Sequence, residues 1–498
     1  MKKKLLILLV LAISVPAFWR MLQFGIYSMQ DFPYIRLVEL DKCFRALQIP
    51  CRWAQDVGAG YGEPLFNFYG QVSFAVGEIF HLVGFSKIDS LKIAFTLSFV
   101  MSAFAMFLLA KKIWKSDWAA IVSSAIYLYA PYRAVDVWVR GDLAESMSFV
   151  FFPLIILEIE NYLSTKKKTY LVLFSLFFAL LLLNHSLSVV LFLPFLIGWT
   201  IFRLLTYKNV KPFVYLAIAG LFSFVISAFY ILPVIFESKF VDIGSTTSGY
   251  FDWRANFVTI GQLFVSRFWG YGGSVWGTDD GLSLSVGQIQ WVLPFLVGLI
   301  VLLRRKFTKD VKIFVALVLI GVFALFLTHN KSTFIWNNLM FMKYIQFPWR
   351  FLSVAVFSFA LASGLIVKYL GKFGVWMAVV VVVIAIALNY NFFRPDIWKS
   401  VTDSDLESGA FWTESRFASI NDYWPNFGHK LPDKISDGKY INYFPGWNYQ
   451  PDKNGLIPAD GAVFSDTPVR TVGNWVSVLA VVLVAATWKK FKYEENKK

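Results

Sequence analysis

Charged residues are scarce in this chain, and so are the residues that commonly bind metals. Only 16% of the 498 residues are Asp, Glu, Lys or Arg, and there are two cysteines and four histidines. The histidines are scattered, at His81, His185, His329 and His429, and neither cysteine has metal-ligand spacing with any of them. The sequence therefore offers no zinc cluster.

Several common catalytic motifs are also absent from the sequence. It has no Walker loop, no dinucleotide-binding fingerprint, no His-Glu-x-x-His and no Gly-x-Ser-x-Gly. A nucleotide-driven machine, a zinc protease and a serine hydrolase consequently have no support in the sequence.

Long apolar runs dominate what is present. Hydrophobic residues make up 57% of the chain, and the mean hydropathy is +0.58. Such a composition excludes an ordinary soluble protein, and runs of this length can cross a bilayer. We expect an all-α polytopic membrane protein with about twelve transmembrane helices, at roughly 5–24, 89–110, 117–131, 147–163, 170–184, 187–203, 213–235, 288–303, 312–328, 351–367, 374–390 and 474–488.

The net charge of +15 comes from short basic clusters between the apolar runs. Examples are Lys2–Lys4, Lys166–Lys168, Arg304–Lys306 and Lys489–Lys498. Under the positive-inside rule each cluster marks a cytoplasmic face, and a single orientation with both termini in the cytoplasm satisfies them all. The basic charge is thus explained by topology and anionic lipid, and no nucleic acid is expected.

The N-terminus also resembles a secretory signal peptide, with Val15-Pro16-Ala17 as a loose cleavage site. A retained first helix fits better, because it places the following loop outside and every later basic cluster inside. We therefore expect a multi-pass protein of the cytoplasmic (inner) membrane.

The long polar segments are expected on the outer face of the membrane. A transmembrane domain over 1–390 carries external loops at 25–88, 132–146 and 236–287, and a small extracytoplasmic lobe over 391–473 precedes a last helix and cytoplasmic tail over 474–498. In the lobe, strands are predicted around Tyr440–Phe444 and Val463, and a helix over 403–420. Cys43 and Cys51 share the first external loop, where a disulfide and two free thiols both remain open.

Asp31 lies just outside the first predicted span. Asp31-Phe32-Pro33 predicts the start of an amphipathic helix that Pro50 ends, with Asp31 as N-cap and with Arg36 and Glu39 turned to water and lipid headgroups. The helix dipole favours an ionised carboxylate at this position, so Asp31 is a candidate general base at the external surface. The alternative is an N-cap with no chemical role.

Ionisable residues crowd the short second external loop. Alternation of these residues with Val, Trp and Leu predicts a partly buried network, made by Arg133, Asp136, Arg140, Asp142 and Glu145. Arginine suits phosphate, so Arg133 and Arg140 are candidate phosphate ligands, with Glu145 orienting them or a substrate hydroxyl. A solvated turn is the alternative.

Two further polar residues stand at the outer ends of apolar spans. His185 lies in the hairpin Asn184-His185-Ser186, and Arg350 lies in Phe347-Pro348-Trp349-Arg350-Phe351. A polar group at the membrane face is costly without a partner, which makes each a candidate site residue. The alternatives are a satisfied turn for His185 and an interfacial anchor for Arg350.

Several motifs together resemble a large group of bacterial membrane proteins with a GT-C-type glycosyltransferase architecture, some of them labelled 6-pyruvoyl-tetrahydropterin-synthase-related. The motifs are Asp31 after the first helix, Tyr61-Gly62-Glu63-Pro64-Leu65-Phe66-Asn67-Phe68-Tyr69-Gly70, Ala130-Pro131-Tyr132-Arg133, Arg140-Gly141, Ala144-Glu145, Phe347-Pro348-Trp349-Arg350, Phe444-Pro445-Gly446-Trp447 and Thr467-Pro468-Val469-Arg470. The resemblance covers nearly the whole chain. The pterin label does not fit, because a pterin synthase needs a zinc-binding histidine cluster.

The resemblance implies a sugar transfer from a polyprenyl-phosphate-linked donor to a glycan, lipid or protein acceptor of the cell envelope, with Asp31 as the catalytic acid residue. Phosphate would be held by Arg133, Arg140 and Arg350, and the substrate by Tyr61, Glu63, Asn67, Trp138, Asp142, Glu145 and His185. Phe32 stands where related motifs carry a second acidic residue or a histidine, so no metal ligand is assigned, and a divalent cation (Mg or Mn) remains an open cofactor.

Two functions other than glycosyl transfer remain open. A lipid or polysaccharide transporter or flippase would be expected to carry ionisable groups at mid-membrane in repeated halves, whereas the predicted spans 89–110, 312–328 and 374–390 have almost none and no halves repeat. The altered acidic motif also fits a catalytically inactive scaffold for envelope assembly.

Overall fold

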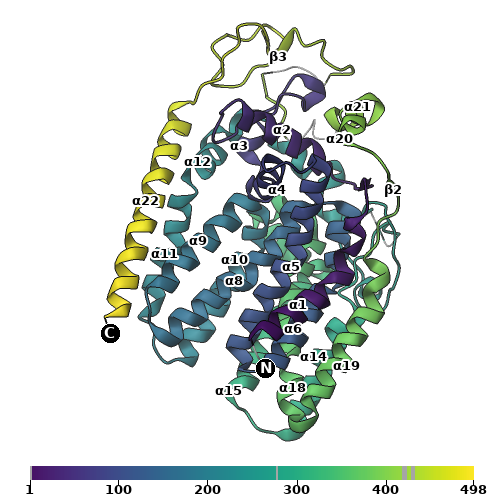
Figure 1. The fold of residues 1–498 in the computed structure, drawn as a ribbon, viewed down its shortest axis with the longest axis vertical. Coiled ribbons are helices and arrows are strands. Elements are labelled where there is room, and N and C mark those ends of the chain that lie inside the picture. Colours follow the sequence, from purple (N-terminus) through teal and green to yellow (C-terminus); the bar gives the residue numbers. More distant parts are fainter. Residues whose placement is uncertain (1–2, 276, 278, 418–422, 428–431, 498) are drawn as a thin grey trace.

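The computed structural model describes residues 3–275, 277, 279–417, 423–427 and 432–497 and is mostly helical. Most long helices run along the long axis of the molecule, and the N- and C-termini lie at the same end (Figure 1). The helices and strands of residues 25–88 and of the 391–473 segment gather at the opposite end.

The centre of the bundle is formed by α5 (Lys87–Trp114), α6 (Asp117–Leu128), α8 (Leu143–Thr165) and α17 (Leu352–Ser363). Hydroxyl and carboxylate side chains begin three of these helices: Ser86, Ser116 and Asp142 each accept a hydrogen bond from a backbone N–H in the first turn. Small residues meet at two of these contacts: the hydroxyls of Ser98 and Ser146 lie 2.6 Å apart, and Ser124 donates to the Ala103 carbonyl at 2.8 Å, as is typical of membrane bundles.

The other long helices surround this centre. They are α1 (Lys3–Phe18), α9 (Thr169–Asn184), α10 (Ser186–Thr206), α11 (Pro212–Ile226), α12 (Ala228–Glu237), α14 (Gln288–Arg304), α15 (Lys309–Thr328), α19 (Gly374–Asn389) and α22 (Pro468–Asn496). Shorter helices are α2 (Pro33–Arg45), α3 (Leu65–Phe68), α4 (Val72–Leu82), α7 (Pro131–Ala134), α13 (Ile260–Phe264), α16 (Thr333–Asn338), α18 (Leu365–Tyr369), α20 (Asp403–Leu406) and α21 (Gly409–Phe417).

Seven helices in the described part of the chain are long and apolar enough to cross a membrane. The number is eight if α11 and α12, which meet at a bend of 75°, form one broken span. Helix also occupies the remaining predicted spans, but α6, α9 and α14 have only 12 to 17 residues. An integral multi-pass protein is thus confirmed, whereas twelve crossings are not shown.

The 391–473 segment forms few regular elements. Strand β2 (Trp398–Lys399) pairs with β1 (Ile26–Tyr27), and β3 (Tyr440–Asn442) pairs antiparallel with β4 (Leu456–Pro458). The predicted strand near Tyr440 is therefore present but ends at Asn442, and Val463 lies outside any strand. The predicted helix over 403–420 is divided into α20 and α21, and its residues 418–420 lie outside the described residues.

Helix α2 differs from its prediction as an interfacial helix. Arg36 and Glu39 are buried, at 7% and 1% exposure, because α4 and α5 pack against α2 and other chain segments cover its remaining faces. Hydropathy along one helix cannot reveal such cover. Near the C-terminal end of α2, Cys43 and Cys51 form a disulfide, which settles the alternative left open by the sequence.

Candidate functional site

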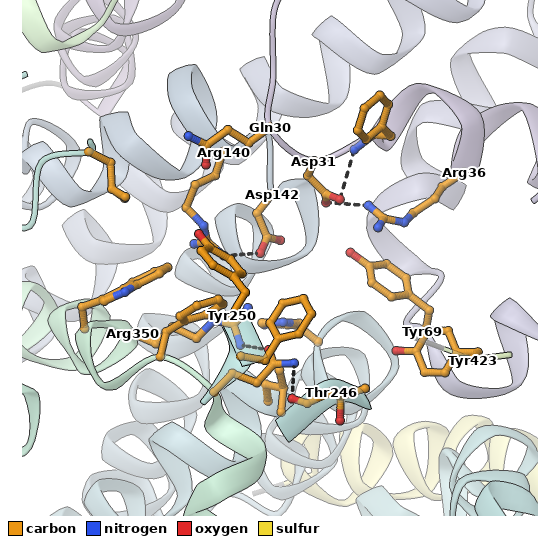
Figure 2. A pocket seen from close by; sticks show the side chains of 18 of the residues that line it. Gln30, Asp31, Arg36, Tyr69, Arg140, Asp142, Thr246, Tyr250, Arg350 and Tyr423 are labelled. Carbon is orange, nitrogen blue, oxygen red and sulfur yellow. Dashed lines mark hydrogen bonds and ion pairs between the residues drawn. The ribbon is translucent and has the colours of Figure 1, made fainter. Parts of the chain in front are cut away.

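A cavity of about 440 Å³ lies at the loop-bearing end of the bundle, where several segments distant in sequence meet. Five of the residues predicted for the site line it: Asp31, Arg140, Asp142, His185 and Arg350. The remaining wall is formed by Gln30, Phe32, Arg36, Tyr69, Leu187, Thr246, Tyr250, Phe251, Leu282, Gln346, Phe347, Trp349, Phe417 and Tyr423 (Figure 2).

The carboxylate of Asp31 is the partly exposed acid of this cavity, with 28% of its side chain accessible. The N-cap of α2 is Phe32 rather than Asp31, which corrects the sequence prediction by one residue. The carboxylate accepts a hydrogen bond from the Phe32 amide at 3.0 Å and forms an ion pair with Arg36. Figure 2 shows this pair at the cavity wall.

The backbone beside Asp31 is hydrogen-bonded to the 132–146 segment. The amides of Gln30 and Asp31 donate to the carbonyls of Val139 and Arg140, at 3.1 and 2.7 Å. Close approach of the two segments requires glycine at 141, where φ is +69° and a Cβ would lie 2.6 Å from the Cβ of Met29. The catalytic candidate and the arginine candidate are therefore held in a fixed relation by main-chain contacts.

Arg140 is surrounded by carboxylates. It ends a π-helical turn, Val135–Arg140, a local geometry often found at functional sites. Its Nη1 donates to Asp136 and to Glu145 (2.9 Å), and its Nη2 donates to Asp142 at 2.8 Å. Burial would raise the pKa of Asp142, but Arg140, with His185 and Arg350, lowers that pKa to about 2. Both terminal nitrogens of Arg140 are thus already engaged.

Arg350 retains more capacity to bind a ligand. Its Nη1 donates to the Ile345 carbonyl at 3.0 Å and to Gln346 Oε1 at 2.9 Å, and its Nε lies 3.3 Å from Glu145 Oε2. Its Nη2 has no hydrogen-bond partner among the described residues. This nitrogen can donate to an anion in the cavity.

His185 and several aromatic rings complete the wall. His185 Nδ1 lies 2.7 Å from Ser188 Oγ, and burial lowers the pKa of the imidazole. Phe347 and Trp349 stack with ring centroids 4.7 Å apart, and the Arg36 guanidinium lies 4.5 Å from the centroid of Tyr69. Flat aromatic faces of this kind can cover the apolar face of a sugar ring.

Other predicted site residues lie away from the cavity. Arg133 is fully buried beneath it, where Nη1 donates to the carbonyl of Ser146 at 2.9 Å and the guanidinium lies over Phe149. Trp138 is also buried and donates to the Ala17 carbonyl at 3.3 Å. These two side chains hold helices together.

The predicted sugar-binding residues of the first loop face other structure. Tyr61 accepts a backbone hydrogen bond from Asn442 at 2.8 Å, and Glu63 is buried with its backbone paired to Ala54. The Asn67 side chain donates to Glu237 at 3.2 Å. Within the region that was expected to bind sugar, it is Tyr69 that reaches the cavity.

Glu145 acts from behind the cavity wall. Its carboxylate accepts from Arg140 and from the Tyr132 hydroxyl and lies 3.3 Å from Arg350 Nε. It therefore contacts both arginines of the cavity wall, Arg140 and Arg350.

Sequence reasoning missed Arg36, Gln30, Tyr250 and Tyr423 as cavity residues. Arg36 and Gln30 are close to Asp31 in sequence, and that proximity was an available signal. Tyr250 and Tyr423 come from loops with no motif, so nothing in the sequence identified them. Within the described residues, no group of three or more His, Cys, Asp or Glu side chains could hold a metal ion.

Comparisons with known proteins gave structural likeness only. No family model matches the chain, and no curated protein matches it. The arabinofuranosyltransferase AftD from Mycobacteria is similar with a TM-score of 0.46 and 13% identity, over 81% of this chain and 28% of AftD. The Archaeoglobus fulgidus oligosaccharyltransferase is similar with a TM-score of 0.45 and 14% identity, over 79% of this chain and 56% of that protein. The chain thus spans less than two thirds of either.

Proposed function

We propose that this protein is a glycosyltransferase that moves a sugar from a polyprenyl-phosphate-linked donor to a cell-envelope acceptor at the outer face of the cytoplasmic membrane. One observation carries the proposal: the partly exposed carboxylate of Asp31 and the buried guanidinium of Arg350 line the same cavity of a membrane protein. A general base and a phosphate ligand are the two groups that this reaction requires.

The reaction joins the acceptor hydroxyl to the anomeric carbon of the sugar. Asp31 takes the hydroxyl proton as the new bond from oxygen to the anomeric carbon forms, and the bond from that carbon to the donor phosphate breaks. Its electron pair stays on the phosphate oxygen, so polyprenyl phosphate leaves with one more negative charge. Arg36 holds the Asp31 carboxylate in place by the ion pair described above.

Arg350 stabilises the leaving phosphate. Nη2 is its only terminal nitrogen without a protein partner in the described chain, and a donor aimed at developing negative charge lowers the barrier most in a site shielded from water. Arg140 adds positive charge to the cavity wall, but its terminal nitrogens are occupied by carboxylates. We assign Arg140 and Glu145 to positioning rather than to direct contact with phosphate.

The aromatic residues of the wall are assigned to the sugar. Tyr69, Tyr250 and Tyr423 each offer a ring and a hydroxyl in the cavity, and His185 offers a ring nitrogen for a sugar hydroxyl. A polar lining of this kind suits a sugar, whereas the polyprenyl chain would remain in lipid.

The test is transfer of radiolabelled sugar by purified protein in lipid nanodiscs, supplied with a panel of polyprenyl-phosphate sugars and envelope acceptors. Asp31→Asn should lower the rate by roughly a hundredfold or more, the usual range for loss of a general base, while donor binding persists. Asp437→Asn, at an exposed carboxylate of the 391–473 segment, is the matched control. Full transfer by Asp31→Asn would refute the role of Asp31. Transbilayer movement of the lipid without any transfer would favour a flippase.

A further inference from the structure

A second, apolar cavity of about 580 Å³ lies between α14 and α15. Its walls are side chains from these helices, from α13 and from Phe359 of α17, and among the residues that the structure describes His329 and Lys331 are the ionisable ones on it. Phe295, Leu299, Leu302 and Val322 are 42–69% exposed along the cavity, so it opens sideways from the helix bundle. An open apolar groove between candidate membrane helices faces lipid.

The two ionisable residues stand at one end of this groove. Both follow the last residue of α15, Thr328, whose carbonyl accepts a hydrogen bond from Val258 at 2.9 Å. Val258 belongs to the loop that also carries the cavity residue Tyr250, so this end of the groove faces the loop-bearing end of the molecule. Lys331 is exposed there and its ammonium is available to an anionic headgroup.

The groove is separate from the candidate active site. The residues that line it and those that line the cavity of Asp31 have no member in common. Because the two linings are distinct, the groove can hold a lipid while the cavity of Asp31 holds the donor.

We propose that the groove between α14 and α15 binds an anionic phospholipid of the outer leaflet, with an acyl chain along Gly298 and its headgroup phosphate at Lys331. Charge complementarity selects the headgroup, and the apolar walls accept the chain. Gly298 gives this chain room, since even a methyl group at this position would have no heavy atom nearer than the ring carbons of Phe314, at 4.0 Å. A bound chain fills the space between two helices that otherwise leave a gap.

The experiment counts phospholipids that stay on the purified protein by native mass spectrometry after mild detergent washing. Phosphatidylglycerol and phosphatidylcholine are supplied in equal amounts, and polyprenyl phosphate is added as a competitor. We expect one retained phosphatidylglycerol, preferred over phosphatidylcholine by roughly fivefold, the effect of about one lysine near an anionic headgroup. Equal retention of the two phospholipids would overturn the headgroup assignment.

Two variants locate the lipid. Lys331→Glu should abolish the preference for phosphatidylglycerol, whereas Lys312→Glu, at the other end of α15, should leave it unchanged. Gly298→Phe should fill the groove and remove the retained lipid. If Gly298→Phe fails to fold, Lys331→Glu still decides the headgroup, because its side chain is exposed. Displacement of the retained phospholipid by polyprenyl phosphate would overturn the proposal, because it would assign the groove to the donor. Sugar transfer is measured separately, so that failure of the lipid site and failure of the glycosyltransferase proposal can be told apart.

Discussion

The amide nitrogen of Asp31 donates a hydrogen bond of 2.7 Å to the carbonyl oxygen of Arg140. The segments 25–88 and 132–146 are thereby joined beside the cavity that Asp31 and Arg140 line. A main-chain bond of this kind fixes the relative position of two side chains without using either of them. The Asp31 carboxylate and the Arg140 guanidinium remain free to make the contacts that define the cavity.

Removal of the Arg350 guanidinium should impair transfer more than its replacement by another cation. Arg350→Ala is expected to lower kcat/KM by roughly a hundredfold to a thousandfold, the range for loss of one donor to a developing oxyanion. Arg350→Lys should recover part of this loss, because the charge remains but the planar fork does not. Initial rates in nanodiscs over a range of donor concentrations measure both.

The matched control is Arg254→Ala. Arg254 is an exposed arginine paired with Asp252 outside the cavity, and its loss should not change kcat/KM. Equal activity of Arg350→Ala and the parent protein would remove Arg350 from the reaction.

Neutralising Glu145 should destabilise the folded protein and also slow sugar transfer. Glu145→Gln weakens the contacts to Arg140 and Arg350 in a buried site, and breaking a buried ion pair costs about 3 kcal/mol of unfolding free energy. Thermal unfolding in detergent, followed by tryptophan fluorescence, measures the change. Asp252→Asn, which breaks an ion pair whose arginine is largely exposed, should show no measurable loss.

Gly141 should tolerate alanine less well than Gly84. Both have positive φ, +69° and +107°, so both variants carry the backbone penalty of about 1–2 kcal/mol. A methyl at 141 would also clash with Met29, whereas nothing lies within 4 Å at 84. The clash should add about 1–3 kcal/mol for Gly141→Ala and lower transfer, because it separates the loops of Asp31 and Arg140. Equal melting temperatures of the two variants would show that the close contact between Met29 and position 141 does not affect stability.

Glu39 should make stability depend on pH. Burial raises the pKa of this carboxyl to about 7, even though Lys42 opposes the shift. The folded form therefore holds a proton that the unfolded chain has lost, so the contribution of Glu39 is complete below about pH 4.5 and disappears as the pH rises through 7.

Replacement of Glu39 by glutamine removes this dependence. At pH 8, Glu39→Gln should be more stable than the parent by up to about 3 kcal/mol, and the difference should vanish at pH 4. Glu414→Gln, at an exposed position of α21, is the control. A parent protein whose melting temperature rises between pH 5 and 8 relative to Glu39→Gln would contradict the prediction.

The membrane orientation can be tested with single cysteines in a chain in which Cys43 and Cys51 are replaced by serine. Cysteines at the exposed positions Lys167, Arg305 and Lys490 should resist a membrane-impermeant thiol reagent in intact cells, because each belongs to a basic cluster expected in the cytoplasm. Lysis of the cells should make all of them react.

Cysteines at Asp279 and Asp452 provide the outer set. Both positions are exposed in the structure, and both should react with the reagent before lysis. The reverse pattern, with the first set labelled and this set silent, would invert the protein and place Asp31 in the cytoplasm. Asp142 and Ser274 are unsuitable reporters, because both side chains are buried.

The sequence alone determined that the chain is a helical membrane protein with its termini at one end. Hydropathy and the distribution of lysine and arginine are properties of local segments, and lipid imposes them segment by segment. For the same reason the sequence located the polar loops and five of the residues that line the cavity, including Asp31 and Arg350.

Which of the ionisable residues face the cavity depends on how distant segments pack together. Arg133 and Arg140 lie in one short loop and are chemically identical, yet one is buried against Phe149 and the other lines the cavity wall. Arg36 was predicted to face water and lipid headgroups, but neighbouring segments bury it. The partners of a charged side chain come from segments distant in sequence, and burial strengthens each such interaction, so its role is set by packing that no local pattern contains.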